Sequence, residues 1–348
     1  MKKVLAGMSG GVDSSVCALL LKKAGYDVCA VNLIMHKSSP EGCGGSEELE
    51  TARSVSSALG IEFMALDFSE EFEREVISYF VTTYISGATP NPCVICNKKL
   101  KFGALLDKAE NMGFDFIATG HYARIEQSAD RFLLKKGLDY SKDQSYVLYS
   151  LSQKQLSHTL FPLGGYEKSE VRSIAEENGL INAKRHDSQD ICFLPDGNYP
   201  EFIEKYTGRT FPCGDFVTSD GKKLGTHKGI IRYTIGQRKG LGLALPSPMY
   251  VMKKDTERNE VVLTENDGLF SKSLDAVNIN LIPFDTLEKP MKVRARVRYS
   301  QSEQEAVIEQ LDENSIHVEF SEPQRAISSG QSVVFYDGEY VIGGGIIK

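Results

Sequence analysis

The chain has 348 residues, of which 41% are hydrophobic and 25% are charged, and its formal net charge is −7. This composition is typical of a folded protein rather than a disordered one, and the length predicts two or three domains. No apolar run approaches the ~20 residues of a membrane span, and the apolar stretch near the N-terminus is too short for a signal-peptide core. We therefore expect a cytoplasmic protein without a membrane partner, in which any RNA binding depends on local basic patches.

Apolar strands alternate with helical patterns through the first third of the chain. Strands are predicted at residues 2–7, 26–35, 61–68 and 114–119. Helices are predicted at residues 13–24, 46–59, 69–86 and 97–112. Such alternation favours a parallel sheet with helices on both faces. The predicted fold class of this part is α/β, with a doubly wound parallel sheet.

The pattern changes after about residue 200, where glycines become dense and helical periodicity fades. Short alternating strands are predicted at residues 250–252, 260–263, 292–299, 305–308, 316–320, 332–336 and 340–342. Alternation with frequent turns predicts a small β-barrel or sandwich. We expect three domains, an α/β domain at 1–205, a small central β-rich domain at 206–268 and a C-terminal β-barrel at 269–348.

A glycine-rich loop joins the first predicted strand to the first helix, and it consists of Gly7, Met8, Ser9, Gly10, Gly11, Val12, Asp13, Ser14 and Ser15. Successive main-chain N–H groups in such a loop, with a helix N-terminus behind them, bind anions. The loop has no lysine to reach a γ-phosphate, so the common P-loop pattern is absent. It resembles the signature of the PP-loop ATP pyrophosphatases, which implies ATP with Mg²⁺ near Asp13 and cleavage between the α- and β-phosphates. A plain glycine turn is the alternative.

Seven cysteines are present, Cys17, Cys29, Cys43, Cys93, Cys96, Cys192 and Cys213. An odd number in a cytosolic protein does not indicate a disulfide scaffold. Cys17 on the apolar face of the first helix and Cys29 in the second strand are predicted core residues, and Cys213 is assigned in the same way. Cys43 lies in a glycine-rich loop and receives no role.

Further motifs carry a resemblance to a family, and they lie at residues 89–102, 118–122, 142–146, 187–193, 298–299 and 323–338. In this order they resemble the bacterial tRNA-specific 2-thiouridylases (tRNA uridine 2-sulfurtransferases), over essentially the whole chain. The resemblance implies ATP-dependent 2-thiolation of uridine at the wobble position (U34) of tRNA. Uracil O2 would be adenylated, and sulfur from a cysteine persulfide would then replace it, releasing AMP and pyrophosphate.

The resemblance also implies site residues. Cys192 would carry the persulfide and Cys96 would be the catalytic thiol, with a Cys96–Cys192 disulfide as a product. We expect Cys96 to begin a helix, where the dipole and nearby lysines lower a thiol pKa. ATP contacts would come from the loop (Gly7 to Ser14), Leu33 and Gly120. Target-base and tRNA contacts would come from Asn91, Pro92, Cys93, His121, Lys142, Asp143, Gln144, Arg298, Tyr299 and Gln331. For His121, a structural hydrogen bond is the alternative.

Position 93 departs from the family's commonest pattern, which has aspartate where this chain has Cys93. A thiol is a poor substitute for a carboxylate in acid/base chemistry. The change also creates a pair of cysteines three residues apart, and Cys93, Cys96 and Cys192 together could hold an iron–sulfur cluster with an open iron site. Persulfide chemistry without a metal is the favoured interpretation.

Basic residues cluster in the second half of the chain. Residues 221–245 contain no acidic residue but do contain Lys222, Lys223, His227, Lys228, Arg232, Arg238 and Lys239. Basic residues also occupy every second position from Lys292 to Arg298, which places them on one face of a strand. Such a face suits phosphate contact, although a solvated strand is the alternative.

The expected partners are the anticodon loop of tRNA and a sulfur donor, either a cysteine desulfurase or a sulfur-relay protein. Two other functions remain open at this point. A PP-loop ligase or amidotransferase for a small metabolite would need neither the basic strand nor the paired thiols. A tRNA-binding protein that has lost catalysis would not need the intact loop and both cysteines.

Overall fold

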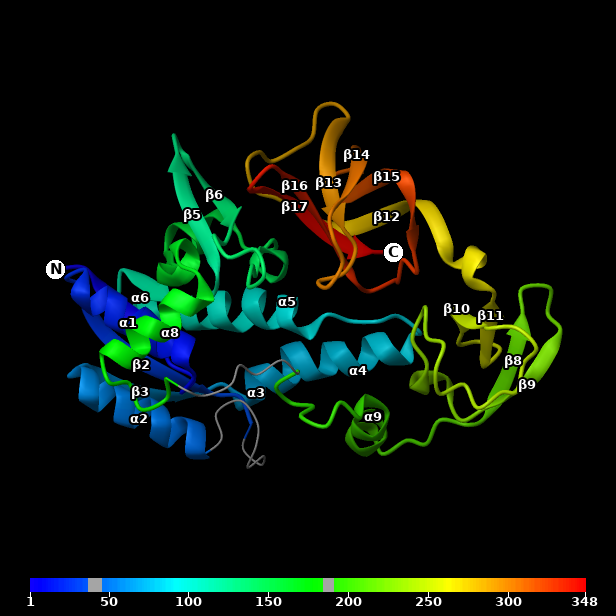
Figure 1. Ribbon diagram of the computed structural model, residues 1–348, viewed down its shortest axis with the longest axis horizontal. Helices are drawn as coiled ribbons and strands as arrows, with labels where there is room; N and C mark the ends of the chain where they lie inside the picture. The colour runs from blue at the N-terminus through cyan, green and yellow to red at the C-terminus, as the bar shows by residue number, and fades with distance from the viewer. Residues whose placement is uncertain (37–45, 184–190) are drawn as a thin grey trace. The chain divides into compact units, whose positions relative to one another are not determined.

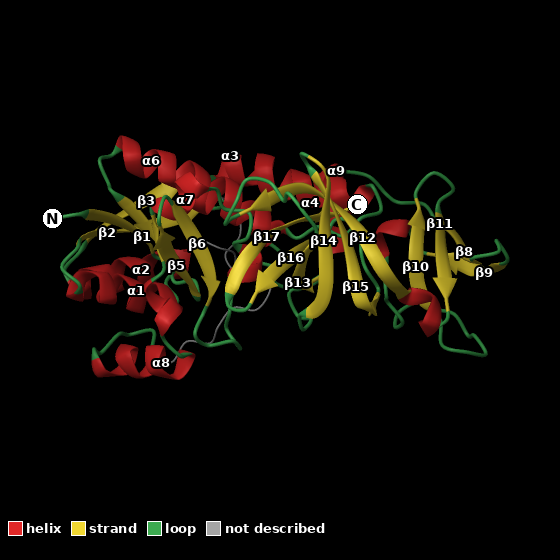
Figure 2. Ribbon diagram, turned by 90° about the horizontal axis from the view of Figure 1, so that it is seen from above, coloured by secondary structure: helices red, strands yellow, loops and turns green. Residues whose placement is uncertain are grey.

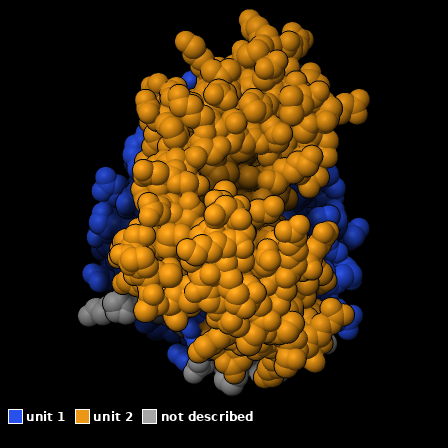
Figure 3. Space-filling view, turned by 90° about the vertical axis from the view of Figure 1, so that its right-hand side faces the viewer, with its two compact units in different colours: residues 1–77, 92–197, 337–343 blue, residues 78–91, 198–336, 344–348 orange. Residues whose placement is uncertain are grey.

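A computed structural model of the chain describes residues 1–36, 46–183 and 191–348. Cys43 and the first residues of the 187–193 motif lie outside the described residues, as do the basic residues at 184–186. The chain forms two compact units (Figure 3). The first unit comprises residues 1–77, 92–197 and 337–343, and the second comprises 78–91, 198–336 and 344–348.

The first unit is built on a parallel sheet, as predicted (Figure 1). In the described residues its strand order is β3-β2-β1-β4-β7, with β1 (Lys3–Gly7), β2 (Asp27–Ile34), β3 (Glu62–Asp67), β4 (Phe116–Ala118) and β7 (Thr159–Leu160). The chain runs outward from β1 to β3 and then returns to the other side of β1. The order therefore reverses beside β1, and ligands of open α/β sheets bind at such a switch point. The glycine-rich loop follows β1 at this place.

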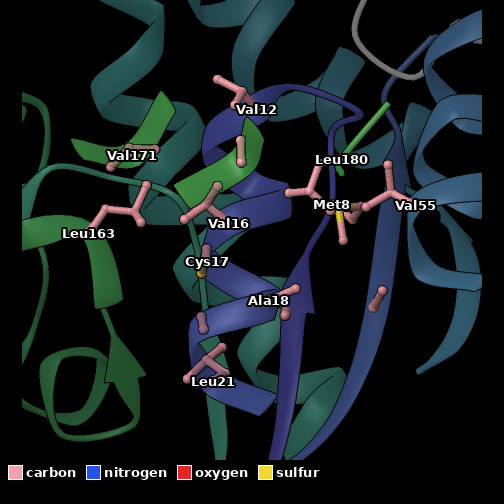
Figure 4. Packing of buried hydrophobic residues seen from close by; sticks show 14 of the residues in the cluster. Met8, Val12, Val16, Cys17, Ala18, Leu21, Val55, Leu163, Val171 and Leu180 are labelled. Atoms are coloured by element: carbon pink, nitrogen blue, oxygen red, sulfur yellow. The ribbon is translucent and has the colours of Figure 1, made fainter. Parts of the chain in front are cut away.

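A hydrophobic core lies between the sheet and helices α1 (Val12–Lys23) and α2 (Ser46–Leu59). Figure 4 shows Val16, Cys17 and Leu21 of α1 packed in this cluster. Burial raises the pKa of the Cys17 thiol, with a smaller contribution from Asp13. Burial likewise raises the pKa of Cys29 to about 11. Both cysteines are core residues, as predicted, whereas Cys213 is exposed and its assignment to the core is wrong.

Helices fill the region between β3 and β4. They are α3 (Ser69–Phe72), η1 (Glu73–Ile77), α4 (Ser78–Ile85), α5 (Pro92–Cys96), η2 (Asn97–Ala104) and α6 (Leu105–Asn111). Both predicted helices are present, but η1 and η2 are π-helical. The prediction that Cys96 begins a helix is wrong, because the helix begins at Pro92 and Cys96 is its fifth residue.

A β-hairpin follows β4 that the sequence analysis did not predict. Its strands are β5 (Ala123–Ser128) and β6 (Arg131–Lys136), and Tyr340 pairs with Lys135 of β6. After it come η3 (Ser145–Val147), α7 (Gln153–Ser157), η4 (Pro162–Gly165) and α8 (Lys168–Glu177). In the described ranges no helix is long and apolar enough to cross a membrane.

The second unit contains two β structures. The smaller sheet has the order β10-β11-β8-β9, from β8 (Gly214–Thr218), β9 (Lys223–His227), β10 (Tyr250–Asp255) and β11 (Glu260–Thr264). Around it are α9 (Tyr199–Thr207), η5 (Ile230–Arg232) and η6 (Asn266–Leu269). Strand β11 pairs in parallel with β8, although the other pairs are antiparallel.

The C-terminal strands form a closed antiparallel barrel, which the sequence predicted (Figure 2). Its order is β12-β15-β14-β13-β16-β17, and a β12–β17 pairing closes it. The strands are β12 (Phe270–Leu281), β13 (Met291–Arg296), β14 (Gln304–Asp312), β15 (Ser315–Arg325), β16 (Ser332–Asp337) and β17 (Tyr340–Ile347). In β13, Val293 and Ala295 are buried while Lys292 and Arg294 are exposed, so the basic residues do share one face.

Candidate active site

The glycine-rich loop has the conformation that anion binding requires. Gly10 has φ +82°, and a Cβ at this residue would lie 2.8 Å from the carbonyl oxygen of Glu48. Helix α1 begins at the end of the loop, and none of the described side chains caps its N-terminus. The hydroxyls of Ser14 and Ser15 each donate to the Gly11 carbonyl, at 3.0 Å in both cases. The first N–H groups of α1 are therefore left for a ligand.

Two buried asparagines, which the sequence analysis missed, hold the loop from outside. Asn182 donates to the Gly10 carbonyl and to the Ser15 hydroxyl, both at 2.8 Å. Asn32 of β2 donates to the Met8 carbonyl at 2.8 Å. These amides satisfy loop carbonyls, while the Ser9 and Gly11 N–H groups of the same peptides donate to the hydroxyls of Ser14 and Ser9, at 3.2 and 3.4 Å. Both groups of each peptide are therefore held by side chains, which fixes the conformation of the loop.

The loop acquires a cation from elsewhere in the chain. Lys168 at the start of α8 donates to both carboxylate oxygens of Asp13, at 2.7 and 2.8 Å. The hydroxyl of Tyr122 donates to the same carboxylate at 2.8 Å. Lys168 and Tyr122 are both buried. No motif marks Lys168, because it is 155 residues from the loop.

Gly120 and His121 follow β4 beside the loop. A Cβ at Gly120 would lie 2.9 Å from the main-chain carbon of Asp13, so only glycine permits this approach. The His121 Nδ1 lies 2.7 Å from the Thr119 hydroxyl, and the ring contacts Phe102 and Phe161. Burial lowers the pKa of His121 well below its ordinary value, with a smaller contribution from Lys101, so the imidazole is neutral at pH 7. The structural hydrogen bond considered for His121 is therefore present.

The three cysteines of interest differ in exposure. Cys96 is buried, Cys93 is exposed three residues earlier on α5, and Cys192 is half-buried. The ring of Phe193, next to Cys192, packs against His36 and Phe72, with centroids 6.3 and 5.7 Å away. Within residues 1–36, 46–183 and 191–348, no three cysteine, histidine or acidic residues are grouped as a metal site.

The segment expected to contact tRNA is partly structural. Asp143 is buried, and its carboxylate accepts from the main-chain N–H groups of Gly137 and Ser145, at 3.0 and 3.1 Å. The Gln144 side chain accepts from the Tyr122 N–H at 3.0 Å. Lys142 is half-buried in the same turn. The geometry therefore gives Asp143 and Gln144 a role in shaping the turn that presents Lys142.

The remaining candidates lie in the second unit. One nitrogen of Arg298 donates to the Ala326 carbonyl and to the Ser328 hydroxyl, at 2.7 and 2.8 Å. Gln331 donates to the carbonyls of Thr89 and Pro90, at 3.0 and 3.1 Å. Asn91 belongs to this unit as well, and Tyr299 is exposed. All other candidates, including Leu33, belong to the first unit.

The basic patches carry acidic partners that their sequence neighbourhoods do not show. One guanidinium nitrogen of Arg232 donates to both carboxylate oxygens of Glu204, at 2.9 and 2.8 Å, and Lys223 pairs with Asp215 at 2.6 Å. His227 is fully buried, so it cannot face RNA. On the barrel, Arg294 lies 3.6 Å from the carboxylate of Glu303. The uninterrupted basic face that the sequence predicted is thus partly neutralised.

An anion-binding loop at the switch point of a parallel sheet, with Cys96 and Cys192 in the same unit and a barrel that follows, defines an ATP-using enzyme of the PP-loop class. Three family models match the chain in order. They are described as a tRNA methyl transferase HUP domain at residues 2–196, a tRNA methyl transferase PRC-barrel domain at 200–265 and an aminomethyltransferase beta-barrel domain at 271–347.

Relatives that match over their full length identify the family more specifically than the family models do. A protein of Acetivibrio thermocellus named tRNA-specific 2-thiouridylase MnmA is 48% identical, over 100% of this chain and 99% of its own length. A protein of Clostridium botulinum named tRNA-specific 2-thiouridylase MnmA 2 is 50% identical, again over 100% of this chain and 99% of its own length. A solved U34-tRNA thiolase from Methanococcus maripaludis is 20% identical over 59% of this chain and 66% of that one, with a TM-score of 0.37, too low to bear on function. The chain belongs to the tRNA-specific 2-thiouridylase family.

Proposed function

We propose that the protein is an ATP-dependent tRNA uridine 2-sulfurtransferase that thiolates the wobble uridine. The observation that carries the proposal is that one unit holds the anion-binding loop together with Cys96 and Cys192. Methyl transfer, which the family-model descriptions name, would need neither group. A ligase or amidotransferase for a small metabolite would leave the two thiols and the barrel unexplained.

The first step uses ATP to activate a poor electrophile. The main-chain N–H groups of the loop and of α1 would bind the phosphates, and Asp13 would lie near the Mg²⁺ that accompanies them. Gly7 to Ser14, Leu33 and Gly120 are the proposed contacts. Uracil O2 attacks the α-phosphorus, pyrophosphate leaves, and the oxygen becomes part of an AMP leaving group. The base is then ready for attack at C2.

The second step supplies sulfur. The thiolate of Cys96 attacks the Cys192 sulfur of the persulfide, which releases hydrosulfide and leaves a Cys96–Cys192 disulfide. Hydrosulfide attacks C2, and AMP leaves with the former O2. A cellular thiol must then reduce the disulfide, which restores both cysteines. The burial of Cys96 limits competing oxidation by solvent species.

The RNA contacts proposed for this reaction come from both units. Asn91, Pro92 and Cys93 would meet the target base, and Cys93 would do so as a weak donor rather than as an acid or base. Contacts to the anticodon loop would come from His121, Lys142, Asp143, Gln144, Arg298, Tyr299 and Gln331. The proposed domains are 1–205, 206–268 and 269–348, and the last would bind tRNA.

Two further parts of the proposal concern partners. A cysteine desulfurase, directly or through a relay protein, would load Cys192 with sulfur. The tRNA substrate supports the cytoplasmic location expected from the sequence.

An iron–sulfur cluster on Cys93, Cys96 and Cys192 is the second candidate chemistry, favoured only by the two cysteines at positions 93 and 96. The visible absorption spectrum and the iron content of protein purified without oxygen distinguish persulfide chemistry from a cluster. Persulfide chemistry predicts no broad visible absorption and no stoichiometric iron. It also predicts that Cys93→Ser keeps most activity, whereas a cluster enzyme would lose it.

The proposal is tested in a strain that lacks the gene, by measuring 2-thiouridine in digested tRNA. Wild-type protein is expected to restore the nucleoside, and neither Cys96→Ala nor Cys192→Ala is expected to do so. Cys213→Ala is the matched control, because that cysteine is exposed and has no proposed role. Normal thiolation by either active-site variant would contradict the mechanism.

A further inference from the structure

The carboxylate of Asp13 is held by two residues that are distant in sequence. Lys168 grips both of its oxygens, at 2.7 and 2.8 Å, and the Tyr122 hydroxyl lies 2.8 Å from one of them. Both partners are more than nine-tenths buried, with exposed fractions of 8% for Lys168 and 3% for Tyr122. Charge-assisted hydrogen bonds of this kind are short and directional. The direction of the Asp13 side chain therefore depends on where these two residues lie.

The main chain of Tyr122 is fastened to the turn that contains Lys142. The Tyr122 N–H donates to the Gln144 side-chain oxygen at 3.0 Å, and the Gln144 N–H donates to the Tyr122 carbonyl at 2.9 Å. Gly137 lies against this exchange, since a Cβ there would be 2.9 Å from the Tyr122 carbonyl oxygen. A shift of Gln144 must therefore move Tyr122.

The main chain of Lys168 is fastened to the other end of the same turn. Its N–H donates to the Asp139 carboxylate at 3.1 Å. That carboxylate also accepts from the N–H and the hydroxyl of Ser141, at 2.9 and 2.6 Å. The hydrogen bond from the Ser141 side chain is the main cause that lowers the pKa of Asp139, which stays ionised at pH 7. Residues 139–144 thus hold both partners of Asp13.

We propose that Tyr122 and Lys168 are positioning residues that couple RNA contact at residues 139–144 to nucleotide binding at the glycine-rich loop. The inference rests on the proposed function, because it assumes that this turn meets RNA. It deepens that function by giving a route through which ATP is bound productively only when RNA is present. The route consists of hydrogen bonds within the first unit, from the turn to Tyr122 and Lys168 and from them to Asp13.

The chemistry of the loop explains why such control is useful. The loop lacks a lysine of its own, so Lys168 is the cation that neutralises Asp13 beside bound phosphates. An Asp13 carboxylate that loses Lys168 would repel the triphosphate, and one that loses the Tyr122 hydrogen bond would place the accompanying cation wrongly. Contact of RNA with the turn would hold Lys168 and Tyr122 in the positions that orient Asp13, and so would increase the affinity for the nucleotide.

The test measures the dissociation constant of a non-hydrolysable ATP analogue, with and without a tRNA anticodon stem–loop, on the full chain. Wild-type protein is expected to bind the analogue about fivefold more tightly, or better, when RNA is saturating. In Tyr122→Phe, which keeps the main-chain exchange with Gln144, that ratio is expected to fall toward one. Lys168→Met should also weaken binding without RNA, and Lys168→Arg should restore part of it. Tyr26→Phe, a partly buried tyrosine packed on the same core, is the matched control.

The outcomes separate this inference from the proposed function. A wild-type ratio of one, or an unchanged ratio in folded Tyr122→Phe protein, would overturn the coupling alone if the wild type still thiolates tRNA. Wild-type protein that binds no tRNA and makes no 2-thiouridine would overturn the proposed function. Circular dichroism spectra that match the wild type establish that each variant is folded.

Discussion

Two lysines in this molecule are equally buried but differ in what surrounds them. Lys168 of the first unit and Lys254 of the second are each 8% exposed. The ammonium of Lys168 has a carboxylate partner in Asp13. Within the described part of the chain, the ammonium of Lys254 has no hydrogen-bond partner and lies 5.7 Å from the centre of the Tyr84 ring.

The two buried charges therefore have different consequences for their units. Burial lowers the pKa of Lys254 to about 8, because the charged form is desolvated and no anion offsets the loss. A β-bulge between Val251 and Lys253 turns Lys254 inward. The paired ammonium of Lys168 belongs to the proposed nucleotide site, whereas the unpaired ammonium of Lys254 destabilises the second unit. Lys292 on the barrel is a third case, because its charge is exposed to solvent.

The largest expected effect concerns Gly120, which lies against the main chain of Asp13. Gly120→Ala puts a Cβ 2.9 Å from the Asp13 main chain, so α1 must move. We expect ATP affinity to fall at least about tenfold, which corresponds to ~1.4 kcal/mol. Gly165→Ala is the matched control, since a Cβ there meets nothing within 4 Å. Equal ATP affinities for the two variants, measured by calorimetry, would break the link between loop position and binding.

The next effect reverses the usual sign of a substitution. Lys254→Met keeps the aliphatic stem and removes a desolvated charge, so we expect the second unit to become more stable by about 2 kcal/mol at pH 7. The measurement is the unfolding midpoint in urea, read from probes of the second unit. Lys168→Met is the paired experiment and should lower stability, because it leaves Asp13 without its cation. Two changes of the same sign would remove the contrast between the two lysines.

The pH dependence of the Lys254 effect sharpens the comparison. The folded-state pKa of about 8 lies below the ordinary value of 10.5, so the unfolded chain binds the proton more tightly between these pH values. Wild-type stability should therefore rise with pH from about 8 to 10.5, relative to Lys254→Met, with a slope of at most ~1.4 kcal/mol per pH unit. A stability difference that stays constant from pH 7 to pH 10 would show that Lys254 is not desolvated.

The smallest expected effect belongs to the exposed lysine. Lys292→Ala should weaken tRNA binding by a few-fold and reduce the slope of log affinity against log salt by about one. Arg294→Ala should do less, because Arg294 is already close to Glu303. Lys272→Ala, which replaces an exposed lysine of β12, is the control. Filter binding at several salt concentrations measures all three, and equal slopes would contradict phosphate contact by β13.

The sequence predicted the parallel sheet, the loop and the closed barrel, because each rests on local periodicity or spacing. It missed Lys168 and Asn182, since nothing local marks a residue that reaches the loop from more than 150 positions away. It also missed the β5–β6 hairpin. It missed the burial of Lys254 because a bulge reverses strand alternation. It also placed Cys96 at a helix start, although Pro92 is at the first helical position, where proline is common.

The central claim is that sulfur passes from Cys192 to uridine at the expense of ATP. The most direct measurement is a single turnover without oxygen, with protein whose Cys192 persulfide carries labelled sulfur, wobble-uridine tRNA and ATP, and no added sulfur donor. We predict up to one labelled 2-thiouridine per protein, together with AMP and a Cys96–Cys192 disulfide. Label that stays on Cys192, or label that reaches tRNA without ATP, would contradict the account.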